Sequence, residues 1–209
     1  MHQLFSRHGR RLKALERVFV DSEARHRQGL PLRITALGQW VPMPHTVLVA
    51  LLTDMKLHDV FRRPLLGRTT VVDAGTGDGR VLAALAHVVP ELDVVGIESD
   101  VGLYHRANAN LETLTRNRLV DRPERLRVIR GDYRRNNTYE LGAIQRSRVG
   151  FVFNYPDGNQ EALAQFVVAS FASGTKLCLL THDSELRLST LELEEHVVSN
   201  GWAWSIYSS

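Results

Sequence analysis

Hydrophobic residues follow two different patterns in alternating segments along most of the chain. From residue 69 onward, short runs that are almost continuously apolar are followed by longer segments with apolar residues at helical spacing. The runs indicate strands at residues 69–75, 92–99, 125–132, 148–156, 175–182 and 202–208, with helices at 79–89, 101–119, 161–171 and 188–201. Strands of this kind, alternating with helices, predict a doubly wound α/β fold whose mostly parallel sheet is covered on both faces.

The N-terminal part of the chain has a different organisation. Residues 9–28 and 46–57 have the apolar spacing of two helices, and an irregular segment, 31–44, joins them. We therefore expect residues 1–64 to form a helical extension that packs on the core. Residues 65–209 then form the main, ligand-binding domain.

The composition of the chain is typical of one globular protein. Of its 209 residues, 44% are hydrophobic and 23% are charged, and no apolar run approaches the roughly 20 residues of a membrane helix. The basic N-terminus lacks the apolar region of a secretory signal, so we expect a cytoplasmic protein without a membrane partner. The single cysteine, Cys178, lies in an apolar run and is expected to be a buried core residue.

The net charge is only +3, but it is unevenly distributed along the chain. Residues 1–33 contain eight basic side chains against three acidic ones, a net charge of +5. Such a basic N-terminal arm can bind an acidic partner or nucleic acid, although a solvated helix face has the same composition. Only three of the 26 basic residues are lysines, and this arginine bias also arises from genomic base composition, which weakens the argument for nucleic acid.

A glycine-rich loop, VVDAGTGDGR at residues 71–80, joins the first predicted strand of the sheet to the helix after it. Ligands of doubly wound sheets bind here, beyond the carboxyl ends of the strands. The loop has Arg80 at the third glycine of a dinucleotide fingerprint, and it lacks the Gly-Lys-Ser/Thr of a P-loop. Asp73 and Asp78 would also repel a pyrophosphate. The loop therefore suits a ligand with a cationic end, such as S-adenosylmethionine; a tight turn without a ligand is the alternative.

Two more acidic residues follow the next two strands. Glu98 ends the second strand, where a carboxylate can accept both hydroxyl groups of a ribose, and Asp100 is a nearby competitor for this role. Asp132 ends the third strand, where it could accept the exocyclic amine of adenine or could instead cap a turn. Acidic residues at three successive strand ends together outline a site for a nucleoside with an amino-acid tail.

The sequence D-A-G-T-G-D-G-R, followed by G-I-E, resembles the class I S-adenosylmethionine-dependent methyltransferases over residues 66–209. The resemblance implies a Rossmann-like, seven-stranded sheet with the cofactor bound across its first strands and no metal ion. The implied cofactor-binding residues are Asp73, Ala74, Gly75, Thr76, Gly77, Glu98, Ser99, Asp132, Tyr133, Asn154 and Pro42. The family's last hairpin needs two strands, and only residues 202–208 remain after the final predicted helix. Six strands are therefore the alternative to seven.

Two segments bear on the methyl acceptor, and the first is VPMP at residues 41–44. A V-P-x-P element ahead of the glycine loop resembles the small protein lysine methyltransferases of archaea and their mitochondrial relatives, which usually carry threonine in place of Met43. The resemblance rests on Val41, Pro42 and Pro44 together with the loop, and it implies that this segment lies over the cofactor. A proline-rich entry to a core helix is the alternative interpretation.

The second segment is FNYPDGN at residues 153–159, on the loop that faces the transferable methyl group in this fold. Asn154, Tyr155 and Asp157 are the expected catalytic residues. The segment partly resembles the N-P-P-Y loop of amino-group methyltransferases that act on nucleobases, where the asparagine binds the amine. Tyr155 fits the lysine-modifying family better, and a tyrosine and an acid could help an amine to lose its proton. A turn that closes the strand is the alternative.

These features predict an S-adenosylmethionine-dependent methyltransferase that acts on a nitrogen atom, with protein lysine as the favoured acceptor. RNA or DNA and a small metabolite are the alternative acceptors. A protein that binds the cofactor without catalysis is a further alternative. His182 and Asp183, at the end of the fifth predicted strand, could line the same mouth.

Overall fold

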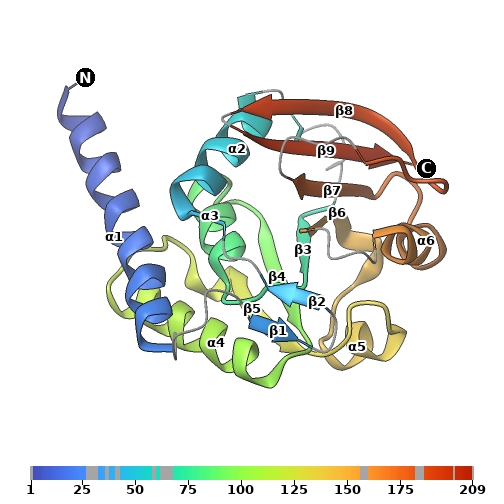
Figure 1. Ribbon diagram of the computed structural model, residues 1–209, viewed down its shortest axis with the longest axis horizontal. Coiled ribbons are helices and arrows are strands. Elements are labelled where there is room, and N and C mark those ends of the chain that lie inside the picture. Colours follow the sequence, from blue (N-terminus) through green and yellow to red (C-terminus); the bar gives the residue numbers. More distant parts are fainter. Residues whose placement is uncertain are drawn as a thin grey trace.

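The computed structural model in Figure 1 describes residues 2–26, 33–35, 38–40, 43–57, 60–61, 68–155, 160–181, 186–199 and 201–208. Its helices are α1 (His2–His26), α2 (His45–Leu57), α3 (Arg80–Val88), α4 (Val101–Arg116), α5 (Asn136–Leu141) and α6 (Gln160–Ser170). Its strands are β1 (Arg33–Thr35), β2 (Gly38–Trp40), β3 (Thr70–Ala74), β4 (Asp93–Glu98), β5 (Leu126–Arg130), β6 (Val149–Asn154), β7 (Lys176–Thr181), β8 (Glu192–Ser199) and β9 (Trp202–Ser208).

Seven of these strands form one sheet, in the order β5-β4-β3-β6-β7-β9-β8. The sheet is parallel except at β9, which pairs antiparallel with both of its neighbours. β3 lies near the centre, with Asp73 opposite Gly96 of β4 and Phe153 of β6. After β3, the chain adds β4 and then β5 on one side of the sheet; after β6, it adds β7 and the pair of β8 and β9 on the other side. This arrangement confirms the predicted doubly wound α/β fold, with seven strands.

Two apolar layers hold the helices on opposite faces of the sheet (Figure 1). On one face, Leu52 of α2 and Leu85 of α3 pack with strand residues such as Phe151. On the other face, Tyr139 of α5 and Leu163 of α6 pack against the same strands. Because every residue of β3 and β6 is buried, these two central strands need mainly apolar side chains, and the sequence pattern follows from that need.

The helix α1 forms an outer layer. Its residues Leu15, Val18 and Phe19 pack against α3 and α4, and Arg11 forms a salt bridge of 2.7 Å with Asp121 beyond the end of α4. Figure 1 shows the first turns of α1 extending past the rest of the molecule. The helix α2, in contrast, belongs to the main core and covers the sheet directly.

The final helix predicted at residues 188–201 is wrong, because the chain forms β8 at Glu192–Ser199 instead. Gly201, with φ at +75°, lies in the turn between β8 and β9 rather than at the end of a helix. The glutamates of this segment resemble a solvated helix in sequence, but an edge strand also tolerates exposed charges. Pairing with the buried strand β9 decides the outcome, and it completes a two-stranded hairpin. The sheet therefore has seven strands, and the six-strand alternative is wrong.

Smaller differences occur elsewhere. The segment expected to be irregular contains the hairpin of β1 and β2, and the short helix α5 was not expected. The prediction for Cys178 is confirmed, since its side chain is fully buried in the core, and burial raises the pKa of its thiol. Among the described residues, no helix is long and apolar enough to cross a membrane.

Candidate functional site

The order of the strands reverses direction between β3 and β6. These two strands are adjacent and parallel, and the helices that follow them, α3 and α6, pack on opposite faces of the sheet. In doubly wound folds, ligands bind at such a switch point, in a crevice outside the carboxyl ends of the strands. Asp73 near the end of β3 and Asn154 at the end of β6 both lie at this switch point.

The glycine loop after β3 has a backbone that only glycine adopts readily. Gly75, Gly77 and Gly79 have φ angles of +82°, +59° and +84°. The amides of Gly75 and Thr76 both donate to the carbonyl oxygen of Ile97, at 2.9 and 3.0 Å. The loop is therefore fixed against the end of β4, and side chains are excluded from the points where the backbone turns.

Asp73 is buried beneath this loop. Its carboxylate accepts a hydrogen bond of 2.7 Å from the hydroxyl group of Thr76. Burial raises the pKa of Asp73 to about 7; the Thr76 hydrogen bond opposes the shift, and the charges of Glu98 and Asp78 add to it. A cation placed beside this carboxylate would favour its ionised form, so Asp73 has the properties of a partner for a positively charged ligand.

Glu98 connects β4 to the glycine loop. Its two carboxylate oxygens accept hydrogen bonds of 2.8 Å from the amides of Gly77 and Asp100. Burial raises the pKa of Glu98, although these amides oppose the shift. The competitor Asp100 instead caps α4, since it accepts a hydrogen bond of 2.8 Å from the amide of Leu103. The neighbouring Ser99 is half-buried between the two acids.

Asp132 follows β5, as expected, but neighbouring arginines engage its carboxylate. It accepts hydrogen bonds from the amide and the guanidinium group of Arg134, at 2.9 and 3.1 Å, and pairs with Arg135 at 3.6 Å. Its partial burial favours a higher pKa, but the hydrogen bonds and charge of Arg134, with the charge of Arg135, lower the pKa overall. The turn-capping geometry is therefore present, and a contact with adenine stays a prediction. The next residue, Tyr133, is buried.

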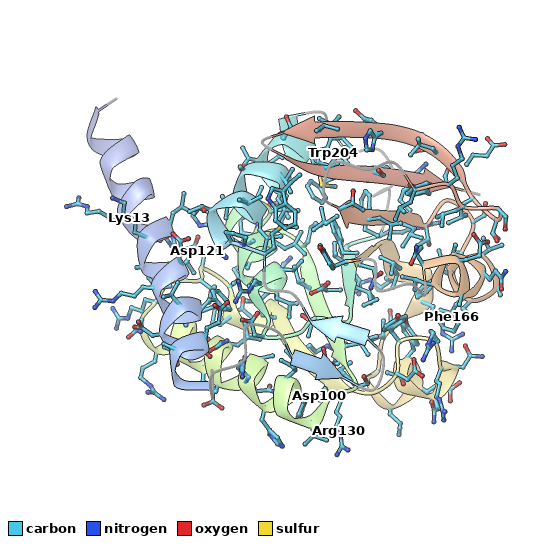
Figure 2. All side chains as sticks on the ribbon, in the orientation of Figure 1. Lys13, Asp100, Asp121, Arg130, Phe166 and Trp204 are labelled. Carbon is cyan, nitrogen blue, oxygen red and sulfur yellow. The ribbon has the colours of Figure 1, made fainter. Side chains whose placement is uncertain are left out.

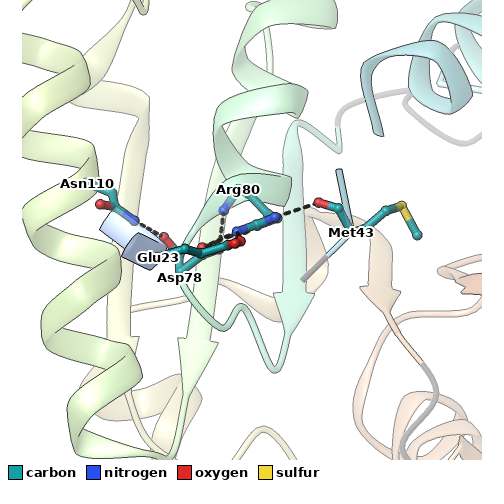
Figure 3. Close-up of polar contacts among 5 residues, drawn as sticks. All are labelled: Glu23, Met43, Asp78, Arg80 and Asn110. Atoms are coloured by element: carbon teal, nitrogen blue, oxygen red, sulfur yellow. Dashed lines mark hydrogen bonds and ion pairs between the residues drawn. The ribbon is translucent and has the colours of Figure 1, made fainter. Parts of the chain in front are cut away.

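The structure corrects the interpretation of Asp78. Its side chain is completely buried and forms hydrogen bonds with the Arg80 guanidinium group at 2.9, 3.2 and 2.6 Å (Figure 3). Arg80 neutralises the charge of Asp78, so this carboxylate is not a free anion that would repel a phosphate ligand. The sequence argument against phosphates therefore rests on Asp73 and on the missing glycine, and no longer on Asp78.

Arg80 also connects the glycine loop to the N-terminal part of the chain. It donates to the carbonyl oxygen of Met43 at 2.7 Å and to the carboxylate of Glu23 on α1 (Figure 3). Asn110 of α4 donates to the carbonyl oxygen of Asp78 at 2.9 Å. Sequence reasoning missed Glu23, Met43 and Asn110 as supports of the loop. Only Arg80 itself carried a signal, because a large cation in a glycine loop requires an anionic partner.

Asn154 presents a polar atom that no other described residue satisfies. Its amide nitrogen donates to the carbonyl oxygen of Ala74 at 2.6 Å, which assigns the orientation of the amide group. Its Oδ1 atom is buried and has no hydrogen-bond partner among the described residues. A Cβ atom on Gly75 would lie 3.8 Å from the Asn154 amide nitrogen and 3.9 Å from the ring of Tyr133. The three residues Gly75, Tyr133 and Asn154 therefore lie close together at the switch point.

The remaining predicted residues are placed only in part. Tyr155 is half-buried, and its ring centroid lies 6.4 Å from that of Trp202. Burial raises the pKa of Tyr155. Residues predicted for the same region lie outside the described part of the chain: Val41, Pro42, Pro156, Asp157, His182 and Asp183. Within the part that the structure describes, no group of three or more acidic, histidine or cysteine side chains is arranged to hold a metal ion.

Gly96 of β4 controls the position of Thr76, and this gives a first test of the loop. A Cβ atom at Gly96 would lie 2.7–2.8 Å from three side-chain atoms of Thr76. Gly96→Ala should therefore displace Thr76 from Asp73 and destabilise the protein by about 1–3 kcal/mol in urea unfolding. Adding Thr76→Ala should recover part of this loss. A Gly96→Ala protein as stable as the parent would contradict the packing described here.

Comparison with known proteins supports the fold. No family model matches this chain, and no curated protein sequence does either. Among solved structures, the rRNA methyltransferase aviRa from Streptomyces viridochromogenes superposes with a TM-score of 0.62 at 14% identity, over 89% of this chain and 92% of its own. An RNA methyltransferase from Salinibacter ruber, solved with S-adenosyl-L-homocysteine, gives 0.56 at 19% identity, over 80% and 93%.

A precorrin methyltransferase from Geobacter metallireducens superposes with a TM-score of 0.50 at 12% identity, over 85% of this chain and 93% of its own. By their names, two of these proteins act on RNA and one acts on a precorrin, but all three have one fold in common with this chain. The chain therefore has the Rossmann-like fold of class I methyltransferases.

Proposed function

We propose that this protein is an S-adenosylmethionine-dependent methyltransferase that modifies a nitrogen atom of RNA. The observation that carries the proposal is the buried Oδ1 atom of Asn154, which has no hydrogen-bond partner in the described part of the chain and lies at the switch point beside the glycine loop. A buried acceptor of this kind is costly unless a ligand donates to it. An amino group of a nucleobase is such a donor.

The residues at the crevice fit S-adenosylmethionine. The glycine loop leaves room for a ligand to approach the backbone, and Asp73 beneath it has the raised pKa of a carboxylate that lacks a cation. In the proposed site, Asp73 binds the cationic methionine end, Glu98 the ribose hydroxyl groups and Asp132 the adenine amine. When bound, the cofactor supplies a methyl group that its positive sulfur atom activates for transfer. The protein then has to position the acceptor and exclude water.

Two features favour an RNA base over a lysine side chain as the acceptor. The rings of Tyr155 and Trp202 lie close to the proposed acceptor site, and flat aromatic surfaces suit a base that leaves its stack. The RNA methyltransferases among the structures with this fold point in the same direction. No comparison supports the lysine acceptor that the sequence favoured.

The test is methyl transfer from radiolabelled S-adenosylmethionine into cell extract that has been separated into RNA, protein and small molecules. We expect label in RNA. Asn154→Ala should lower kcat by about 10- to 100-fold, because one oriented hydrogen bond to the acceptor is lost. Its affinity for the cofactor, measured by calorimetry, should change by less than about threefold, since one weak contact is worth little in binding.

Asn154→Asp is the matched variant, since it keeps the acceptor oxygen and the volume, and its protonated form can still donate to the carbonyl oxygen of Ala74. It should retain more activity than Asn154→Ala. Label that appears only in protein would show that the acceptor is wrong. Calorimetry that detects NAD but not S-adenosylmethionine would overturn the cofactor as well.

A further inference from the structure

Arginine is concentrated in a part of the fold that the proposed acceptor site does not use. Residues 116–148 contain ten arginines and four acidic residues, a net charge of +6 in a chain whose net charge is +3. This stretch includes the end of α4, all of β5 and α5. We call six of its residues the arginine edge: Arg125, Arg127, Arg130, Arg134, Arg135 and Arg148.

The arginine edge surrounds an open border of the sheet. β5 is the outermost strand on its side, and in the described sheet it pairs with β4 alone. Val128 in the middle of β5 is buried, whereas Arg127 and Arg130 are exposed. Residues three apart in a strand point to opposite faces, so these two arginines flank the border from both sides. A partner that follows the border therefore meets positive charge on each face.

At the amino end of β5, three guanidinium groups line one pocket of about 310 Å³, and they belong to Arg125, Arg127 and Arg148. Arg127 and Arg148 each donate a hydrogen bond to a neighbouring oxygen atom, which holds the groups in place. A guanidinium group has five N–H donors, so further donors remain for an anion. Asp93 and Glu124 also line the pocket and offset part of the charge, which leaves it positive.

At its carboxyl end, the arginine edge reaches the proposed cofactor site. Arg130 pairs in register with Glu98 of β4. Arg134 and Arg135 follow in the next turn, where both contact the carboxylate of Asp132, which offsets part of their charge. Figure 2 shows Arg130 at the rim of the molecule. A strand of five residues spans about 15 Å. The arginine edge therefore extends from the pocket to the end of the sheet where the methyl group would be transferred.

The opposite border of the sheet has the opposite charge. β8 is the outer strand there, and it carries Glu192, Glu194 and Glu195, of which Glu194 pairs with Lys176 of β7. One sheet therefore has a basic and an acidic border. Such a charge distribution orients an approaching polyanion so that it meets β5 and not β8.

The N-terminal arm, which the sequence marked as basic, offers less free charge. Arg11 is engaged by Asp121, and Arg17 lies 3.7 Å from Asp21 in the next turn of α1. Arg10 and Lys13 are exposed, and Figure 2 shows Lys13 projecting from α1 away from the core. These two residues therefore serve as a control surface of the same charge on a different part of the molecule.

We propose that the phosphate backbone of RNA lies along the arginine edge and delivers a base to the crevice at Asn154. The proposal rests on the proposed function, which it extends by naming the surface that holds the substrate. Arginine suits this role because its planar, permanently charged group binds a phosphate through two hydrogen bonds. Such contacts fix the position of the nucleic acid without selecting a sequence.

The experiment is fluorescence anisotropy with a labelled RNA hairpin that has a single-stranded loop, titrated with the full chain at several salt concentrations. The test variant is Arg127→Ala/Arg148→Ala, and a second variant is Arg130→Ala. The control is Arg10→Ala/Lys13→Ala on α1. All four side chains of the two double variants are exposed, so thermal unfolding should confirm an intact fold in each.

We expect the Arg127→Ala/Arg148→Ala protein to bind RNA at least tenfold more weakly than the parent. The slope of log K against log salt should fall by about 0.7–0.9 for each phosphate contact that is lost. The control variant should bind within about twofold of the parent, because exposed charges remote from the interface contribute little. Equal binding by parent and edge variants, or a loss confined to the α1 control, would overturn the proposal. So would self-association of the parent that the edge variants abolish.

Methyl transfer measured on the same samples separates this inference from the proposed function. If the edge variants bind RNA with parental affinity and still methylate it, the proposed function stands, but the arginine edge is not the surface that binds the substrate. Conversely, a parent protein that binds RNA through the arginine edge but labels only protein would contradict the proposed function alone.

Discussion

Arg80→Met is expected to lower the free energy of unfolding by about 3–5 kcal/mol, because it leaves the buried Asp78 carboxylate without its cationic partner. Burial acts against the charged guanidinium group, but the hydrogen bonds and charge of Asp78, followed by those of Glu23, raise the pKa of Arg80 overall. Arg80 therefore stays charged in the folded protein. Methionine keeps much of the side-chain volume but none of the five donors, so the effect isolates the charge and its hydrogen bonds.

Urea unfolding measures this effect, and Arg17→Met is the control. The side chain of Arg17 is 82% exposed and faces Asp21 in an ordinary surface pair, so its replacement should cost less than about 0.5 kcal/mol. The double variant Asp78→Asn/Arg80→Met should lose less than the sum of the two single variants, since no charge is then left buried. An Arg80→Met protein within about 1 kcal/mol of the parent would contradict the charge network in Figure 3.

The affinity for S-adenosylmethionine should rise with pH up to about pH 7, following the ionisation of Asp73. Burial raises the pKa of Asp73 to about 7, so below that pH the carboxyl group is mostly neutral and a cationic ligand has to displace its proton. Between pH 5.5 and 7 the dissociation constant should fall by up to about tenfold per pH unit. This range lies below the pKa of about 7.7–8.0 at which a free α-amino group loses its own charge.

Asp73→Asn should weaken cofactor binding by about 30-fold or more at pH 7.5, because a buried partner of the ligand's positive charge is removed. Calorimetry between pH 5.5 and 7.5 measures both effects, and the Asn variant should show a flat pH profile. A parental profile without slope would mean that Asp73 does not face the cation. The same pKa shift affects the ligand-free protein in the opposite sense. The raised pKa contributes stability below pH 4, and this contribution is lost as the pH rises through 7.

The geometry of the glycine loop and its place after β3 could be predicted from the sequence because the information is local. Asp73, Gly75 and Gly77 are neighbours in the chain, and a buried strand followed by a glycine loop has the same geometry in every doubly wound sheet. The places of Glu98 and Asp132 at the ends of β4 and β5 could also be predicted, because strands and helices alternate regularly along this part of the chain. Their hydrogen-bond partners could not be predicted, since a sequence does not show whether a carboxylate faces a ligand or a neighbouring arginine.

The errors arose where partners far apart in the chain decide the outcome. Asp78 looked like part of the ligand site, but it belongs to a network with Glu23, which precedes Arg80 by 57 residues. The segment of β8 looked helical, and only its pairing with β9 makes it a strand. The surface role proposed for Arg127 also depends on the strand order, which places β5 at the border of the sheet.

The position of β9 has a consequence for how the protein is made. β9 lies between β7 and β8, so residues 202–208 form an inner strand of the sheet although they follow β8 in the chain. Chains emerge from the ribosome with their N-terminal residues first. β3, β4, β5, β6 and β7 can pair as they appear, but β8 has no described partner until β9 has also emerged. The acidic border of the sheet is therefore assembled last, and until then the inner edge of β7 is open to contacts with other chains.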